Sequence, residues 1–153
     1  MNLDRRLSSA LHALLHLARR PGPVTSEELG RCLNANPVVV RRTMAGLREA
    51  GLVRAEKGRG GGWSVARDLS TVTVRDVHAA LGGPSVFAVG VRSRVPGCLV
   101  EQAVNGALDV ALREAEALLL ARLEQVTLAE LAEDLERRVL ARGLHTQTIR
   151  ASE

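Results

Sequence analysis

Apolar residues recur every three or four positions over most of this chain, which is the pattern of helices with one buried face. The pattern predicts helices over residues 4–19, 25–33, 36–50, 73–81, 99–124 and 127–142. Two short stretches, 53–57 and 63–66, alternate apolar and polar residues and predict strands that pair as a hairpin. We therefore expect a mainly α fold with one small β-hairpin, an α+β class.

The starts of the helices are marked by residues that bind free backbone N–H groups. The capping-box pattern, a threonine followed three residues later by an acid, occurs at Thr25/Glu28, Thr73/Asp76 and Thr127/Glu130. Asn36 and Pro37 begin another helix, because asparagine caps an N–H and proline at the first position lacks one. A tight turn at residues 33–35, which includes the last residue of the preceding helix, joins the two helices and predicts a helix-turn-helix.

The spacing of apolar residues also predicts which faces are buried. The first helix is expected to bury Leu7, Leu11, Leu14, Leu15 and Ala18. In the helix that starts after Asn36, Val40, Met44 and Leu47 share one face. The opposite face holds Val38, Arg41, Arg42, Ala45 and Arg48, which is typical of a recognition helix that meets base edges. Cys32, on the preceding helix, is expected to be a buried apolar filler.

Four glycines and one arginine form the predicted hairpin tip, at residues 58–62. Glycine accepts positive φ and lets a backbone approach a surface closely. The single side chain at the tip is that of Arg59, which suits the negative potential of a narrow minor groove. No phosphate-loop GK[ST] follows and no helix is predicted to start there. The recognition helix and this hairpin together predict a winged helix-turn-helix.

Charge is distributed unevenly along the chain, although the net charge is only +4. Residues 31–67 contain eight basic residues against Glu49 and Glu56. Residues 99–142 contain five basic and nine acidic residues. This asymmetry indicates a face that binds a polyanion and a separate face for another purpose.

The helix predicted over residues 99–124 is long for this chain. It would extend about 35 Å at 1.5 Å per residue, close to the size of the whole domain. A domain of this size cannot bury the full apolar stripe of such a helix. We expect the stripe to pair with that of a second copy, so that a homodimer presents two recognition helices to a pseudo-palindromic site on double-stranded DNA.

Composition places the chain among ordinary globular proteins, with 46% hydrophobic and 25% charged residues. No apolar run is long enough for a membrane span and the N-terminus lacks a signal-peptide pattern, so we expect a cytoplasmic protein without a membrane partner. Two distant cysteines suit a reducing compartment. His12 and His16 could share a metal, but no third ligand is near, and we expect none. No catalytic constellation is found, so no enzyme is expected.

The assembled motifs resemble the Rrf family of bacterial winged-helix transcription regulators, which includes the IscR and NsrR types. The similarity covers nearly the whole chain. It rests on LHALLHLA in the first helix, NPVVVRRTMAGLREAGLV in the recognition segment, KGRGGGW in the wing, VTVRDVHAALGG, and VTLAEL in the last helix.

The resemblance implies a homodimer paired through the long helix, with the recognition helix in the major groove and the wing arginine in the minor groove. The residues expected to contact DNA are Thr25, Ser26, Asn36, Val38, Arg41, Arg42, Arg48, Lys57, Arg59 and Gly60. Trp63 stands where the family usually has tyrosine, and we expect it to pack the wing onto the domain rather than to contact DNA.

The chain departs from the family at the sensor. Iron-sulfur members have three cysteines just before the long helix, whereas only Cys98 stands there in this chain. We therefore expect no cluster and no other cofactor. Cys98 is either an inert cysteine or a sensor thiol, because a helix N-terminus lowers a thiol pKa. A cluster held by Cys98 with non-cysteine ligands, or shared across a dimer, stays open as an alternative.

The expected division of the chain follows from these features. Residues 1–83 form the DNA-binding domain, 84–98 a loop and candidate sensor region, 99–142 a helical dimerisation region and 143–153 a flexible tail. The leading hypothesis is a homodimeric, sequence-specific transcriptional regulator that acts as a repressor. Two alternatives remain: a winged-helix module for protein–protein assembly, and a redox sensor of the same family that uses Cys98.

Overall fold

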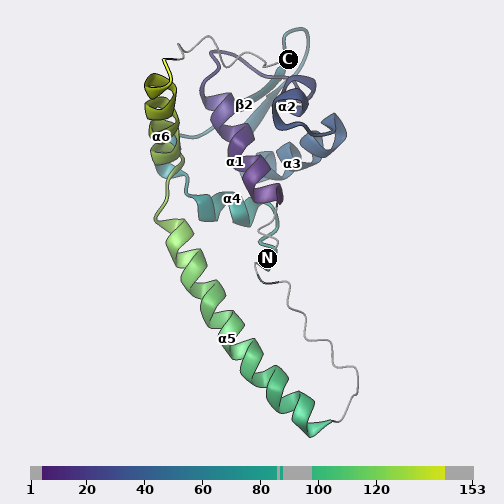
Figure 1. Cartoon of the computed structure of the whole chain (residues 1–153). Coiled ribbons are helices and arrows are strands. Elements are labelled where there is room, and N and C mark those ends of the chain that lie inside the picture. The colour runs from purple at the N-terminus through teal and green to yellow at the C-terminus, as the bar shows by residue number, and fades with distance from the viewer. Residues whose placement is uncertain (1–4, 86, 88–97, 144–153) are drawn as a thin grey trace.

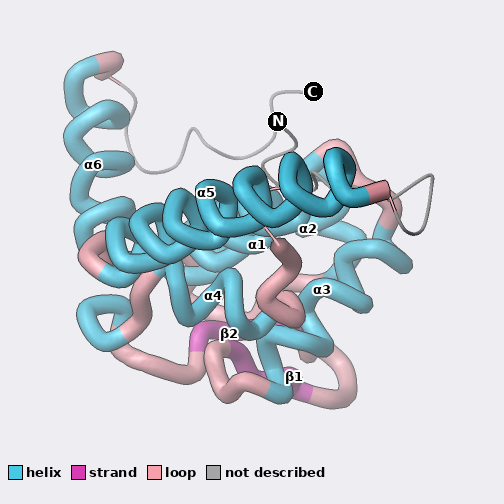
Figure 2. Tube along the Cα trace, turned by 90° about the horizontal axis from the view of Figure 1, so that it is seen from below, coloured by secondary structure: helices cyan, strands magenta, loops and turns pink. Residues whose placement is uncertain are grey.

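A computed structural model describes residues 5–85, 87 and 98–143 of the chain. The predicted loop over 84–98 and the predicted tail over 143–153 lie largely outside these residues. The described elements are α1 (Arg5–Ala18), α2 (Ser26–Leu33), α3 (Pro37–Glu49), β1 (Val53–Glu56), β2 (Gly62–Val65), the 3₁₀ turn η1 (Leu69–Thr71), α4 (Val74–Ala80), α5 (Leu99–Glu124) and α6 (Leu128–Ala141). The mainly helical α+β class is confirmed, and Figure 2 shows the two short strands at one edge of the molecule.

The helix boundaries follow the capping signals in the sequence. Reciprocal capping boxes open three helices: Thr25 with Glu28 for α2, Thr73 with Asp76 for α4, and Thr127 with Glu130 for α6. Asn36 caps α3 through its side-chain oxygen, which accepts a hydrogen bond from the Val38 N–H at 2.8 Å. Gly51 follows the end of α3 with φ of 71°, a conformation that glycine adopts without strain.

The core forms around α1, which packs against α2, α3, α4, α6 and β2. Its most buried side chains include Leu14 of α1, Leu29 of α2, Met44 and Leu47 of α3, and Leu128 of α6, none of them more than 1% exposed. The face predicted for α3 is confirmed. The face predicted for α1 is partly wrong, since Ala18 is exposed. Ala10, Ala13 and Leu17 are buried instead, because α1 is covered on several sides.

The chain between residues 99 and 142 does not behave as one unit. Helix α5 leaves the domain as an arm, whereas α6 returns alongside α1 (Figure 1). Leu128 at the start of α6 belongs to the same buried cluster as Leu14 of α1. Near the other end of α6, Arg19 forms an ion pair with Glu136 at 2.8 Å. Helix α6 is therefore packed against the same core as α1, whereas most of α5 extends away from that core.

Backbone pairing fixes the corner where α5 turns into α6. The N–H of Val74 donates to the carbonyl of Val126 at 2.9 Å, and the N–H of Leu128 donates to the carbonyl of Val72 at 2.9 Å. Arg75 of α4 adds an ion pair with Glu124 at the end of α5. The direction of the arm is thus set by contacts to α4 and to the segment before it.

Candidate nucleic-acid interface

Helix α3 is anchored by its apolar face and leaves its other face to solvent. Val40, Met44 and Leu47 are at most 3% exposed. Arg41, Arg42 and Arg48 are exposed, as the sequence predicts. Val38 and Val39 are also exposed, at 65% and 57%. An exposed face that combines arginines with small apolar groups can donate to guanine and contact the methyl group of thymine.

The wing is a tight antiparallel hairpin of β1 and β2. Val53 pairs with Val65 at its base and Glu56 pairs with Gly62 near its tip. Gly60 in the tip has φ of 78°, and a Cβ at Gly62 would lie 2.6 Å from the carbonyl oxygen of Val24. The glycines are therefore required by backbone geometry, and they leave the tip slim enough to approach a groove.

The wing is fastened to the start of α2 by Trp63. Its backbone N–H and carbonyl pair with Val24 at 2.8 and 2.9 Å, and its indole Nε1–H donates to the Ser26 hydroxyl at 2.9 Å. The expectation that Trp63 packs the wing onto the domain is confirmed. Sequence reasoning missed the bond to Ser26, because no local pattern connects two residues 37 positions apart.

Two of the residues expected at the DNA interface have other roles in the fold. Ser26 is only 7% exposed and accepts the indole hydrogen bond. Thr25 is half-buried, and its hydroxyl is engaged in the capping box with Glu28. The hydroxyls of Thr25 and Ser26 are therefore both engaged within the fold. The remaining expected residues are exposed, namely Asn36, Val38, Arg41, Arg42, Arg48, Lys57, Arg59 and Gly60.

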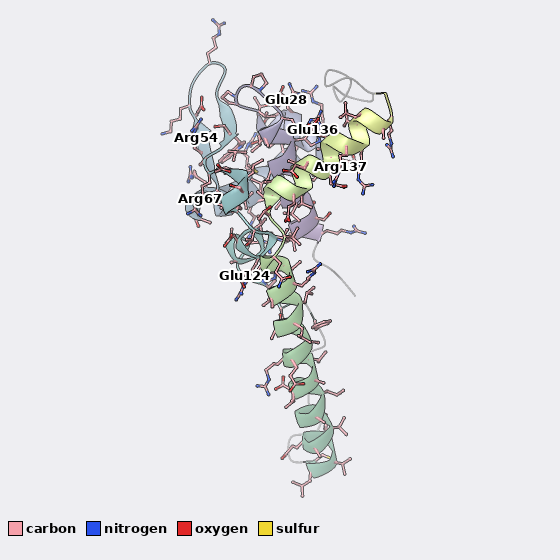
Figure 3. All side chains as sticks on the ribbon, turned by 90° about the vertical axis from the view of Figure 1, so that its left-hand side faces the viewer. Glu28, Arg54, Arg67, Glu124, Glu136 and Arg137 are labelled. Carbon is pink, nitrogen blue, oxygen red and sulfur yellow. The ribbon has the colours of Figure 1, made fainter. Side chains whose placement is uncertain are left out.

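All eight basic side chains between residues 31 and 67 are exposed. Arg54 is tied to the wing surface, since its Nε donates to the Ser64 hydroxyl at 3.0 Å and lies 3.5 Å from Glu56. Arg41 is paired with Glu27 of α2. Figure 3 places Arg54 and Arg67 beside the hairpin, while α5 extends away from it. Basic charge therefore covers α3 and the wing and is separated from the arm.

Cysteine and histidine positions bear on whether a metal can be held. Cys32 is exposed on α2, so the prediction that it is a buried filler is wrong; α2 buries Ser26, Leu29 and Gly30 instead. Cys98 is half-buried at the N-cap of α5 and makes no side-chain cap hydrogen bond. His12 and His16 face each other on α1, with their Nε2 atoms 3.0 Å apart. Burial, and then the neighbouring His12, lower the pKa of His16.

These side chains do not fit an iron-sulfur cluster held by one chain. The chain has two cysteines, which lie in different elements, and three thiolates are needed for the family pattern. Among residues 5–85, 87 and 98–143 no group of three or more His, Cys, Asp or Glu side chains gathers to hold a metal ion. Within the same residues, no helix has the length and apolar character to cross a membrane.

The chain is similar to known regulators over most of its length. The family model for Rrf2, described as an iron-dependent transcriptional regulator, matches residues 3–134. YffB of Lactococcus lactis, a proposed HTH-type transcriptional regulator, is 29% identical over 140 residues, which cover 89% of this chain and 90% of YffB. Rv1287 of Mycobacterium tuberculosis, another proposed HTH-type regulator, is 28% identical over 136 residues, covering 86% and 81%.

Solved structures share the fold. The IscR structure from T. potens superposes with a TM-score of 0.68 at 21% identity and covers 90% of each chain. A proposed transcriptional regulator from Lactobacillus plantarum gives a TM-score of 0.74 at 24% identity, and the match covers 94% of this chain and 96% of that one. The family consists of transcriptional regulators, which confirms the expectation that the chain is not an enzyme. With residues 3–134 matched, the chain belongs to the Rrf2 family of winged-helix transcriptional regulators.

Proposed function

We propose that this regulator is a homodimer that binds a pseudo-palindromic operator through both grooves of duplex DNA and acts as a repressor. The observation that carries the proposal is the exposed face of α3, where Arg41, Arg42 and Arg48 stand free of the core that anchors the helix. A helix presented in this way fits the major groove. Repression follows if the bound dimer occupies a promoter.

The wing supplies the second groove contact in this proposal. Arg59 is exposed at the glycine-rich tip, and Lys57 precedes it. A narrow minor groove attracts an inserted arginine through its enhanced negative potential. The wing therefore adds affinity, while α3 reads bases.

Pairing through α5 completes the proposal. This helix has 26 residues and none of them is buried. Val100, Val104 and Leu118 are 73%, 52% and 75% exposed, and they recur at helical spacing along one face. A second copy of α5 would cover this face and relate two DNA-binding domains by a two-fold axis. In this arrangement residues 1–83, together with α6, form the DNA-binding unit.

The residue considered for sensing a signal is Cys98. Cys98 lies at the N-cap of α5, where it is either an inert cysteine or a sensor thiol. We also propose that the protein acts in the cytoplasm, where its operator DNA lies.

A salt titration of DNA binding tests the proposed contacts. Binding to a fluorescent duplex from upstream of the protein's own gene is measured by anisotropy for wild type, Arg41→Ala and Arg59→Ala. We expect weaker binding by both variants, and a salt slope that is shallower by about 0.9 wherever the substitution removes a phosphate contact. Arg113→Ala on α5 is the control and should bind as wild type does. Binding that survives both substitutions with an unchanged slope contradicts the docking.

A further inference from the structure

An ion pair joins the two helices of the helix-turn-helix. Nη2 of Arg41, in α3, lies 2.5 Å from Oε1 of Glu27, in the first turn of α2. Both side chains are more than half exposed, at 56% for Arg41 and 58% for Glu27. The pair therefore lies on the surface of the motif, where it can meet a ligand, and not in the core.

The partners of this pair are both charged. A backbone N–H at the start of α2 and then the Arg41 guanidinium lower the pKa of Glu27, so its carboxylate is ionised at neutral pH. That carboxylate offsets the charge of Arg41. Arg42, the next residue, forms no ion pair with the residues that the structure describes, so its charge is not offset in this way. Neighbouring arginines on one helix are thus electrostatically different.

The consequence depends on where each residue meets DNA. With α3 in the major groove, the helix before it crosses the sugar–phosphate backbone. A carboxylate at the N-terminus of α2 then repels phosphates and competes with them for Arg41. A guanine edge presents neutral O6 and N7 acceptors, which a carboxylate does not repel as it does a phosphate. Arginine has five N–H donors, so Arg41 can bind a base while it keeps Glu27.

Building on the DNA-binding function proposed above, we propose that Glu27 determines sequence specificity: it positions Arg41 toward a base edge, guanine by its acceptor pattern, and denies Arg41 to phosphates. Glu27 acts through Arg41 and is a positioning residue. The charge of Arg42 adds affinity for DNA of any sequence, and Arg41 distinguishes the operator from other sequences. Removing the carboxylate frees Arg41 for any phosphate, which strengthens binding to every sequence and lowers the preference for the operator.

The test compares two duplexes, the tightest binder selected from a random library and a scrambled duplex of the same composition. Dissociation constants are measured over a range of salt for wild type, Glu27→Gln, Arg41→Ala and the double variant. Glu27→Gln keeps the shape of the side chain and removes its charge. Glu49→Gln, an exposed carboxylate on α3 without an ion pair to the described residues, is the matched control. Circular dichroism checks that every variant is folded.

We expect Glu27→Gln to tighten binding to the scrambled duplex about fivefold at about 0.15 M salt and to steepen its salt slope by about 0.9, the effect of neutralising one more phosphate. The ratio of affinities for the selected duplex over the scrambled duplex should fall in Glu27→Gln. When Arg41→Ala is already present, adding Glu27→Gln should leave that ratio unchanged. The inference is overturned if the preference stays within about twofold of wild type, if Glu49→Gln lowers it equally, or if the effect persists without Arg41. A wild type that fails to discriminate the duplexes instead contradicts the proposed function itself.

Discussion

At the scale of single residues, Trp63 is the side chain that connects the wing to the helix-turn-helix. Its indole N–H donates to Ser26, whose side chain is almost fully buried. The same residue pairs through its backbone with Val24, just before α2. A hydrogen bond to a buried hydroxyl fixes an orientation that apolar packing alone leaves less defined. The position of the wing relative to α2 thus depends on one residue of β2.

Replacing Trp63 with phenylalanine should destabilise the domain beyond the effect of burying a smaller ring. The substitution removes the N–H donor and leaves the buried Ser26 hydroxyl without this partner, at a cost of about 1–3 kcal/mol. Urea unfolding followed by circular dichroism measures the change. Adding Ser26→Ala to Trp63→Phe should recover part of the stability, because the unpaired hydroxyl is gone. A double variant no more stable than Trp63→Phe alone would show that the hydrogen bond is not the cause.

At the scale of elements, α5 is the helix that stands apart from the core. It meets the domain at its C-terminal end, through α4 and the corner before α6. Farther along the arm it presents apolar side chains to solvent, and Leu99 and Leu118 are 77% and 75% exposed. An apolar stripe this long on a globular protein indicates an interaction surface.

A charge on the apolar stripe of α5 should separate the dimer. Val104→Glu places a carboxylate within the proposed interface, where it would be desolvated without a partner. Gln102→Glu adds the same charge two residues away, near the opposite side of the helix, and serves as the control. Sedimentation equilibrium should show a dimer for wild type and Gln102→Glu and a monomer for Val104→Glu. A wild type that is monomeric, or a Val104→Glu variant that stays dimeric, contradicts pairing through this face.

Elements with local signals can be predicted from the sequence. Each capping box uses a threonine and an acid three residues apart, so short windows of sequence suffice for the starts of α2, α4 and α6. The same is true of α3, which begins with Asn36 and Pro37. The 26-residue length of α5 is also predictable, because its apolar period continues without a proline or a cap.

Features that depend on packing between distant segments cannot be predicted from short stretches of sequence. Cys32 is exposed rather than buried, because α1 and the Val24–Trp63 pairing decide which side of α2 faces the core. Ser26 is expected at the DNA surface, but it is buried and accepts a hydrogen bond from Trp63, which lies 37 residues away in the sequence. The pairing of Arg41 with Glu27 joins two helices across the turn and has no sequence signature.

At the scale of the whole molecule, the basic surface and the arm are held in a fixed relation. Backbone hydrogen bonds to the segment around α4 fix the corner between α5 and α6. Helix α6 packs on α1, and Glu136 of α6 forms an ion pair with Arg19, the residue after α1. Helix α3 in turn packs on α1 and α4. A two-fold axis through paired α5 helices would therefore set the distance between two copies of α3.

Selection of bound sequences from a random duplex library is the decisive experiment for a dimer that reads DNA through α3, because it reports both the bases read and the spacing between the two copies. We expect enrichment of an inverted repeat whose half-sites lie about 10 base pairs apart, or a multiple of that spacing, centre to centre. The same selection with Val104→Glu should yield single half-sites bound more weakly. A library that shows no enriched sequence after repeated rounds with the folded wild-type protein would contradict sequence-specific binding by this dimer.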